Sequence, residues 1–270
     1  MSSPTRGARH TRPKPPLLVA ALAAVCVLFL LLPLVGLVLR APWGSLAEEL
    51  ARPEIRAALW LSLRVSLLAT LLSLLFGVPL AWVLARGDFR GRSLVRGLAL
   101  LPLVLPPVVG GVALLLVLGR LGFVGGLLEE LFGLRLFGTT AGAVVAATFV
   151  ALPFLVLTVE AALRALDVRY EDAASTLGAS PWTVLWRITL PAVMPALGAG
   201  AVLAWARALG EFGATITFAG NLPGRTQTIP LAVYVELQRG LDGAITLSLV
   251  LVAVSLTVIV AMRDRLVSSP

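Results

Sequence analysis

The sequence contains few charged residues, one cysteine and one histidine. Charged side chains make up 13% of its 270 residues, against about 25% in typical soluble domains. Cys26 has no second cysteine, which excludes a disulfide within the chain and a cysteine metal cluster. His10 is the only histidine and lies in a basic tail, so catalysis or metal binding by histidine is not expected. These shortages exclude an ordinary soluble domain.

Catalytic and nucleotide-binding motifs are also absent. The sequence has no GxxxxGK motif followed by Ser or Thr, no GxSxG elbow, no HExxH pair and no paired aspartates in an apolar run. We therefore expect no catalytic residue, no metal and no cofactor on this chain, and any ATP that drives it must be hydrolysed by a partner. The net charge of +8 does not require nucleic acid, because arginines collect on the cytoplasmic loops of membrane proteins.

What the sequence has in abundance is long apolar runs. Each exceeds or approaches the roughly 20 residues that cross a bilayer, and none alternates as the strands of a β-barrel do. The first run is longer than the h-region of a signal peptide, about 7–15 residues, and is expected to remain as an anchor. The predicted fold class is all-α, a polytopic bundle of about six transmembrane helices. The expected spans are 17–39, 57–85, 94–118, 140–163, 194–214 and 244–262.

The third expected span is unusual because it contains prolines and adjacent glycines. Pro102, Pro106 and Pro107 lie in it together with Gly110 and Gly111. In a membrane such residues are tolerated where neighbouring helices or a water-filled cavity satisfy the freed backbone groups. The same residues would break a helix in a soluble protein.

The positive charges are distributed unevenly between the two sides of the expected bundle. Thirteen lysines and arginines fall on the N-terminal tail, on the loops near Arg90 and Arg169, and at the C-terminal end; seven fall on the other three loops, with seven acids. Because positive charges favour the cytoplasmic side, both termini are expected there, with the inverted topology as the alternative. The predicted organisation is a basic cytoplasmic tail at 1–16, a first span with an outer connector at 17–56, and a transmembrane core at 57–265.

A segment between the fourth and fifth spans, residues 167–191, is the least hydrophobic part of the second half of the chain. Its small side chains recur on one helical face, which lets another surface approach closely, and its acids suit a helix N-terminus. Asp167 and Ser180 are candidate helix caps. A helix lying in the membrane interface would instead need bulky apolar anchors and many basic residues. We call residues 167–191 the coupling segment; its candidate docking residues are Glu171, Asp172, Ala173, Ala174, Leu177, Gly178 and Ala179.

The coupling segment resembles the EAA loop of binding-protein-dependent ABC importer permeases. The shared pattern is Ala173-Ala174, Gly178 after three residues, and Ile188-x-Leu190-Pro191 after nine more. The motif's leading glutamate falls at Asp172, with Glu171 just before it, and the resemblance does not decide which acid makes the contact. With the six-span hydropathy, the resemblance covers nearly the whole chain beyond the tail. It implies a permease without its own ATPase site, whose coupling helix docks on a cytoplasmic ATPase subunit.

The stretch 206–234, ARALGEFGATITFAGNLPGRTQTIPLAVY, looks like the corresponding region of molybdate importer permeases, as does 153–163. Sulfate permeases share only its first part. The resemblance implies an ATP-driven molybdate importer in a bacterial-type plasma membrane, with a homodimer of permeases, ATPase subunits and an extracytoplasmic molybdate-binding protein. Sulfate and tungstate remain alternative cargoes.

Two charges lie in or beside the fifth span, where a charge costs about 2.5–3.5 kcal/mol on insertion scales. Arg207 and Glu211 are four residues apart on one helical face, so they can pair with each other or face a pathway. Glu160 in the fourth span can likewise form an ion pair or face a pathway, or it lies near the membrane interface. The hydroxylated and small residues that follow Glu211 suit a gate, although helix packing explains them as well. The candidate pathway residues are Arg207, Glu211, Gly213, Thr215, Thr217 and Asn221.

A stand-alone secondary carrier is the competing function. It would need a proton or sodium relay, for which Glu160 and Glu211 are the only candidates in the expected spans, and usually an internal repeat, which the sequence does not show. A membrane-embedded enzyme is the weaker third option, because the catalytic motifs are missing.

Overall fold

The computed structural model describes residues 16–267, without the side chains of 259 and 261–267. Throughout this part of the chain the regular structure is helical, which confirms the predicted all-α class. Five of the described helices are long and apolar enough to cross a membrane, and a bent pair raises the number to six. The predicted basic tail lies outside the described residues, apart from Pro16.

Helix α1 (Leu17–Leu39) is a unit by itself and matches the first expected span. None of its residues is buried, and it carries no charge along its length. A helix that is apolar all round is suited to a lipid environment. The unit ends at Ala41.

The second unit starts at Pro42 and holds the remaining helices, the outer connector included. The prediction had grouped residues 42–56 with the first span. In the structure Arg52 of this connector forms an ion pair with Glu236, 3.0 Å away. The elements of the unit are α2 (Leu46–Ala51), α3 (Pro53–Arg86), α4 (Arg92–Val104), α5 (Pro107–Leu118), α6 (Phe123–Phe132), α7 (Thr140–Ala165), α8 (Arg169–Thr176), α9 (Pro181–Val184), the π-helix η1 (Leu185–Thr189), α10 (Leu190–Leu209), α11 (Gly213–Phe218), α12 (Ile229–Arg239) and α13 (Leu241–Val267).

The core of the second unit lies between α3, α7 and α10. Small residues let these helices approach closely, as is usual where helices pack within a membrane. A Cβ at Gly77 of α3 would lie 3.0 Å from the side chain of Leu155, and one at Gly200 of α10 would lie 3.1 Å from the same leucine. Leu155 is fully buried between them. The three helices therefore form one packed body.

The third expected span, 94–118, is broken in the structure. The chain bends by 118° between α4 and α5, across a break at Leu105 and Pro106. Both residues of the break are extended, with ψ of 134° and 131°. Pro106 and Pro107 are the cause, since a proline disfavours helical backbone in the residue before it and donates no hydrogen bond.

The fifth expected span, 194–214, begins earlier and ends earlier than predicted. The helical run is continuous from Pro181 to Leu209, so the second half of the coupling segment is its first part. It ends at Gly210, and α11 is a separate short helix that begins at Gly213. After the break, Oε1 of Glu211 accepts a hydrogen bond from the Ala214 backbone N–H in the first turn of α11. The spans at α3, α7 and α13 differ from prediction by a few residues only.

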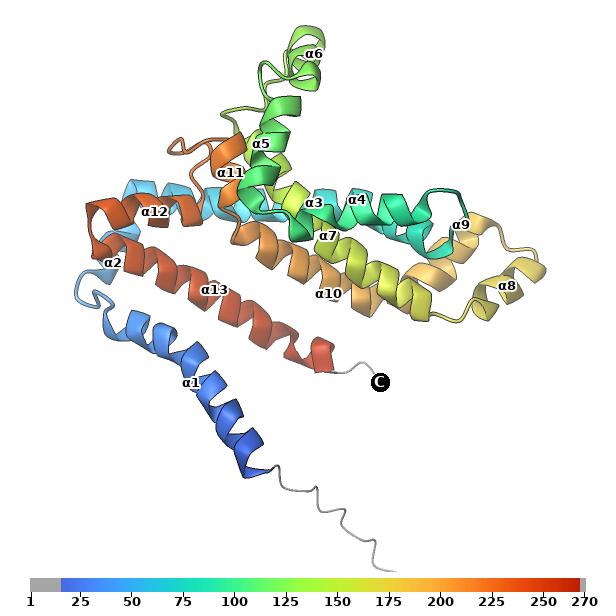
Figure 1. Ribbon diagram of the computed structural model, residues 1–270, viewed down its shortest axis with the longest axis horizontal. Helices are drawn as coiled ribbons and strands as arrows, with labels where there is room; N and C mark the ends of the chain where they lie inside the picture. The colour runs from blue at the N-terminus through green and yellow to red at the C-terminus, as the bar shows by residue number, and fades with distance from the viewer. Residues whose placement is uncertain (1–15, 268–270) are drawn as a thin grey trace, which may run out of the picture. The chain divides into compact units, whose positions relative to one another are not determined.

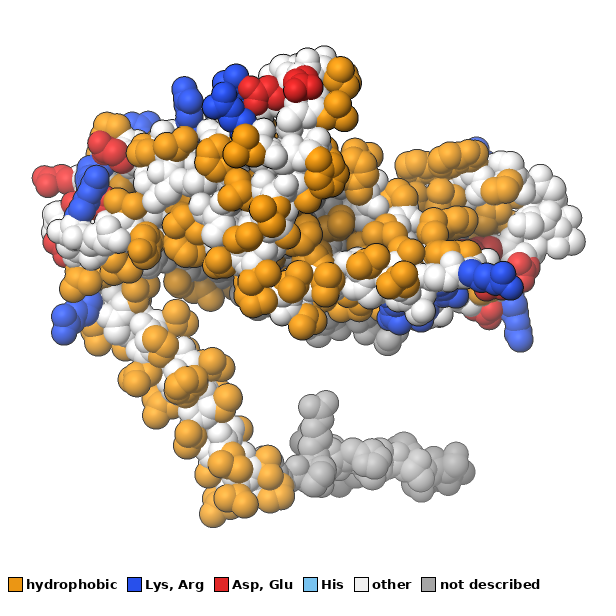
Figure 2. Space-filling model, turned by 45° about the horizontal axis from the view of Figure 1, so that its top comes forward, with side chains coloured by type: hydrophobic (Ala, Val, Ile, Leu, Met, Phe, Trp, Pro, Cys, Tyr) orange, Lys and Arg blue, Asp and Glu red, His pale blue; other side chains and the backbone are white. Residues whose placement is uncertain are grey.

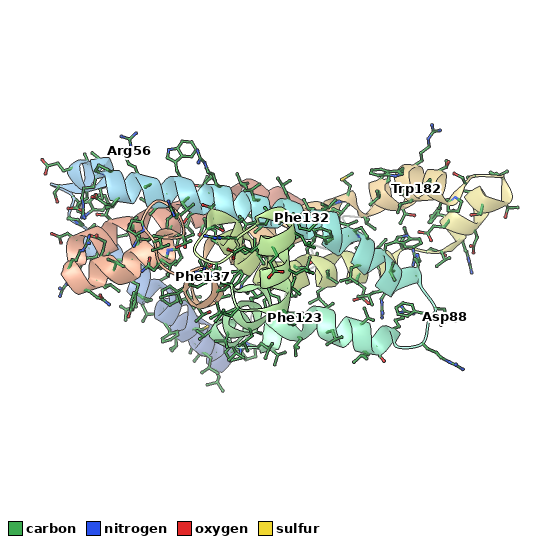
Figure 3. All side chains as sticks on the ribbon, turned by 90° about the horizontal axis from the view of Figure 1, so that it is seen from above. Arg56, Asp88, Phe123, Phe132, Phe137 and Trp182 are labelled. Atoms are coloured by element: carbon green, nitrogen blue, oxygen red, sulfur yellow. The ribbon has the colours of Figure 1, made fainter. Side chains whose placement is uncertain are left out.

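The two ends of the second unit carry different segments. Helices α8 and α9 lie at one end, and α2 and α12 lie at the other (Figure 1). Asp88, in the loop before α4, lies at the same end as Trp182, whereas Arg56 lies at the opposite end (Figure 3). Apolar side chains cover much of the surface between these ends, and charges gather toward its edges (Figure 2). This is the arrangement of a helical body crossing a bilayer.

Candidate functional site

The coupling segment is built from α8, a tight turn and the helices α9 and η1. Gly178 has a φ of +87°, a left-handed conformation that favours glycine and that closes α8. The hydroxyl of Ser180 accepts a hydrogen bond from the Thr183 N–H and caps α9, with Pro181 in its first turn. Asp167 Oδ1 accepts from the Arg169 N–H before α8. Ser180 is therefore the N-cap that the sequence suggested, whereas the N-cap of α8 is Val168 and Asp167 lies one residue before it.

The predicted docking residues divide into an outward and an inward group. Asp172, Ala173, Leu177 and Gly178 are exposed, and 89% of Leu177 is accessible to solvent. No heavy atom lies within 4 Å of a Cβ built at Gly178, so the surface there is open. Ala174 and Ala179 are half-buried, and Glu171 turns toward the body of the protein.

Glu171 makes the most extensive contacts of the coupling segment. Arg86, the last residue of α3, donates from Nε to Oε2 at 2.9 Å and from Nη2 to Oε1 at 3.2 Å. The Thr189 hydroxyl donates to Oε1 at 2.8 Å. Sequence reasoning missed both partners: Thr189 lies inside the motif and shows no pattern of its own, and Arg86 is 85 residues away.

Exposed tryptophans were also missed. Trp182 and Trp186 lie four residues apart on α9 and η1, and both are more than 60% exposed. A pair with this spacing shares one helical face. Tryptophans at a helix end are enriched where a span meets the membrane surface, and this was the signal that could have identified them.

Glu160 of α7 is held by two arginines near the same end. Arg164 Nη2 lies 2.7 Å from Oε1, and Arg96 of α4 lies 3.2 Å from Oε2. The carboxylate is 1% exposed. Of the two readings that the sequence left open for Glu160, the geometry favours a structural ion pair that joins α4 to α7.

Arg207 and Glu211 form an ion pair, one of the two arrangements that their spacing allowed. Their Nη1 and Oε2 atoms lie 2.6 Å apart, with the glutamate 1% and the arginine 25% exposed. The other oxygen of Glu211 accepts the Ala214 N–H at 2.7 Å. One carboxylate thus neutralises Arg207 and joins the end of α10 to the start of α11.

The remaining candidate pathway residues are packed against α5 or within a loop. A Cβ at Gly213 would lie 3.0 Å from Pro107, and one at Gly111 would overlap the Thr217 hydroxyl. That hydroxyl donates to the Gly213 carbonyl at 2.8 Å, and Thr215 is buried. The backbones of α11 and of the broken span are therefore in close contact.

Asn221 lies outside this contact, in the loop before α12. Its side-chain oxygen accepts a hydrogen bond from Gln227 Nε2 at 3.0 Å. The loop is further fixed where the Ser62 hydroxyl of α3 accepts from the Ile229 N–H at 2.6 Å. The structure thus brings five of the six predicted pathway residues to the α10–α11–α5 junction, and places Asn221 apart.

An ionic cluster lies at the opposite end from the coupling segment. Arg52 bonds to Glu236 and to Glu49, and Arg239 also lies 3.2 Å from Glu236. Hydrogen bonds from Arg52 to Glu236 and Glu49 raise the pKa of the guanidinium above its usual value, so Arg52 stays charged. The cluster fixes α12 to the start of α3. Among the described residues no group of three or more acids, histidines or cysteines is placed to hold a metal.

Residues 77–269 match the family described as binding-protein-dependent transport system inner membrane component. The chain belongs to this family. It is a multi-pass membrane component of a transport system, and the match covers every candidate site residue of the coupling segment and the pathway.

Curated relatives extend the match over most of the chain. The molybdenum transport system permease protein ModB of Mycobacterium tuberculosis is 46% identical over 239 residues, 88% of this chain and 90% of its own. The protein of the same name from Escherichia coli is 48% identical over 209 residues, 77% and 91% of the two chains. A sulfate transport system permease protein of Escherichia coli is 39% identical over 221 residues, 81% of this chain and 79% of its own.

Solved structures share the fold. A bacterial ABC transporter involved in the import of the acidic polysaccharide alginate has a TM-score of 0.73 and 18% identity, and covers 93% of this chain. The same kind of transporter in complex with an alginate-bound periplasmic protein has a TM-score of 0.74. The helical arrangement is therefore that of an ABC transporter permease.

Proposed function

We propose that this chain is the membrane-spanning subunit of an ATP-driven molybdate importer. The observation that carries the proposal is the 46% identity, over 88% of the chain, to a molybdenum transport permease. Two copies form one translocation pathway, and each docks one ATPase subunit through its coupling segment. ATP-driven closure of the ATPase pair draws the docked segments together and opens the pathway toward a loaded extracytoplasmic binding protein.

Geometry supports the predicted topology. The coupling segment and the basic loop at Asp88 share one end of the second unit, and the connector at Arg56 lies at the other (Figure 3). With positive charge favouring the cytoplasm, the coupling segment and both termini face the ATPase. The exposed Leu177 and the open surface at Gly178 leave room for a partner there.

The ion pairs argue against a stand-alone carrier. Glu160 and Glu211 were the candidate relay groups, and each is bound to arginine at 2.7 Å or less. Each carboxylate is therefore engaged in a contact within the protein, and neither faces a pathway without a partner. The pair at Glu211 also neutralises Arg207, so this arginine does not trap an oxyanion on its way through.

The second candidate is a sulfate permease, which the 39% identity to a sulfate transport protein favours. The discriminating experiment measures which oxyanion is held by the binding protein that stimulates ATP hydrolysis in the assembled complex. Calorimetric titration should give at least about 100-fold tighter binding of molybdate than of sulfate, a difference of about 2.7 kcal/mol. A preference for sulfate would replace the proposed cargo, and tungstate is titrated in the same series.

A further inference from the structure

Two adjacent acids at the start of α8 differ in their exposure and in their partners. The Glu171 side chain is 14% exposed and both of its oxygens accept hydrogen bonds, from Arg86 and from Thr189. Asp172 is exposed, on the outer face of the helix. The two residues that the motif leaves as alternatives for contacting an ATPase are therefore in different environments.

The Glu171 carboxylate joins elements that are far apart in the sequence. Arg86 ends α3, and its Nη2 also lies 3.4 Å from the backbone carbonyl of Leu166, the residue that follows α7. Thr189 is 1% exposed and ends η1, which continues into α10. Glu171 thus ties α8 to the end of α3 and, through Thr189, to the start of α10, while Arg86 adds a contact to the end of α7. These three helices form the packed core.

We propose that Glu171 is a positioning residue that fixes the coupling segment to the core helices, and that Asp172 is the acid that faces the ATPase subunit. This inference rests on the proposed function. The backbone on either side of α8 consists of short turns, at 166–168 and 177–180. If these turns were its only connection to the core, a docked α8 could move without moving the neighbouring helices. A bidentate contact between arginine and carboxylate fixes geometry as well as distance, so movement of α8 is passed to α3 and α10.

The reverse assignment would require contacts to be lost. For Glu171 to reach a partner, its hydrogen bonds to Arg86 and Thr189 would have to break. A 13%-exposed guanidinium and a 1%-exposed hydroxyl would then lack their partner, which is costly for groups with little access to water. Asp172 needs no such rearrangement, because its side chain is already exposed.

The test uses the complete complex of permease, ATPase and binding protein in proteoliposomes, with three measurements. These are retention of the ATPase on the permease, ATP hydrolysis, and molybdate taken up per ATP. Glu171→Gln should retain the ATPase within about threefold and lower uptake per ATP by about tenfold or more. Asp172→Asn should weaken ATPase retention by about tenfold. Glu48→Gln, an exposed acid at the opposite end, is the matched control and should change neither.

A charge exchange separates positioning from simple loss of folding. Arg86→Glu alone should uncouple as Glu171→Gln does, and Arg86→Glu combined with Glu171→Arg should restore uptake per ATP to within about threefold of the unmodified complex. Thr189→Val, which removes one of the three hydrogen bonds, should give an intermediate loss. Arg86→Lys alone should retain only part of the coupling, because lysine keeps the positive charge but cannot make the bidentate contact.

Each result decides the assignment. If Glu171→Gln releases the ATPase as strongly as Asp172→Asn does, Glu171 is a docking residue and the inference is wrong. Failure of the exchange to restore uptake when both single variants have lost it would also overturn it. These outcomes differ from failure of the proposed function, in which the unmodified complex itself would bind no ATPase or transport no molybdate.

Discussion

Glu160, Glu171 and Glu211 are largely removed from solvent, and each lies against arginine. The pairs at Glu160 and Glu211 leave the carboxylate 1% exposed. The pair of Arg135 with Glu129, at 2.6 Å, is equally short but leaves the arginine 65% exposed. Distance alone does not decide what a pair contributes, because water screens the exposed pair and a buried carboxylate depends on its arginine for compensation of its charge.

The first prediction compares a buried with an exposed pair. Arg207→Ala should lower the free energy of unfolding by about 3 kcal/mol, because it leaves the buried Glu211 carboxylate without its arginine. Arg135→Ala should lower it by less than about 1 kcal/mol. Both variants are measured by denaturant titration of the purified protein in mixed micelles. Equal losses for the two would show that the burial of Glu211 has no energetic consequence.

At the scale of single elements, the turn after α8 combines a left-handed backbone conformation with open space. Gly178 has a φ of +87°, and no heavy atom lies within 4 Å of the position that a Cβ would take there. The glycine is thus required by its own backbone rather than by any contact within the chain. Any steric limit on the size of the side chain at this position would therefore come from a partner protein, not from this chain.

The second prediction follows from this difference. Gly178→Ala should cost about 1 kcal/mol, the strain of a left-handed alanine. Gly178→Trp should fold with a similar cost, since its side chain projects into open space, but should abolish ATPase binding in a pull-down from detergent. Retained binding and normal uptake by the tryptophan variant would count against docking at this surface.

The contact between α5 and α11 gives the third prediction. A methyl group at Gly111 would overlap Thr217 and would lie 2.8 Å from the Ala214 carbonyl oxygen. Gly111→Ala should therefore destabilise the protein by about 1–3 kcal/mol, the usual range for overpacking. The control is Gly97→Ala in α4, where nothing lies within 4 Å and loss of helix stability is not expected. Thermal denaturation of the two variants makes the comparison, and a Gly111→Ala protein as stable as the control would contradict the close packing.

The sequence predicted the existence of the long helices better than it predicted their breaks. Apolar length located α1, α3, α7 and α13 because lipid imposes a fixed requirement on a span. The 118° turn between α4 and α5 was not predictable in size, although Pro106 and Pro107 indicated an irregularity. Proline removes a hydrogen bond and restricts the preceding residue, but the packing of α11 on α5 belongs to tertiary structure.

In the candidate site, contacts within one helix were easier to anticipate from the sequence than contacts between distant elements. The four-residue spacing of Arg207 and Glu211 placed them on one helical face and allowed either a mutual pair or a pathway role, and the structure shows the pair. The partnership of Glu171 with Arg86 was not predictable, since it depends on how α3 lies against the coupling segment. That contact changes the interpretation of two adjacent acids that look equivalent in sequence.

At the scale of the whole molecule, the proposed function requires that the two ends of the second unit face opposite sides of the membrane. Asp88 and Arg56 mark these ends and are both exposed (Figure 3). Cys26 is the chain's only cysteine, so a background without it needs one substitution. The molecule is therefore well suited to topology mapping by single cysteines.

The fourth prediction is the result of such mapping. In a Cys26→Ala background, an impermeant maleimide added to intact cells should label Arg56→Cys and not Asp88→Cys. Disrupting the membrane should make both react. Labelling of Asp88→Cys from outside would establish the inverted topology and would place the coupling segment away from any cytoplasmic ATPase.

The central claim is that the chain moves molybdate only as part of an ATP-driven complex, and uptake by proteoliposomes tests it most directly. Vesicles with the permease, its ATPase and the molybdate-loaded binding protein should accumulate molybdate when ATP is supplied to the ATPase side, and should lose uptake when any one component is omitted. Accumulation by the permease alone, without ATPase and ATP, would contradict the claim and make the chain a carrier.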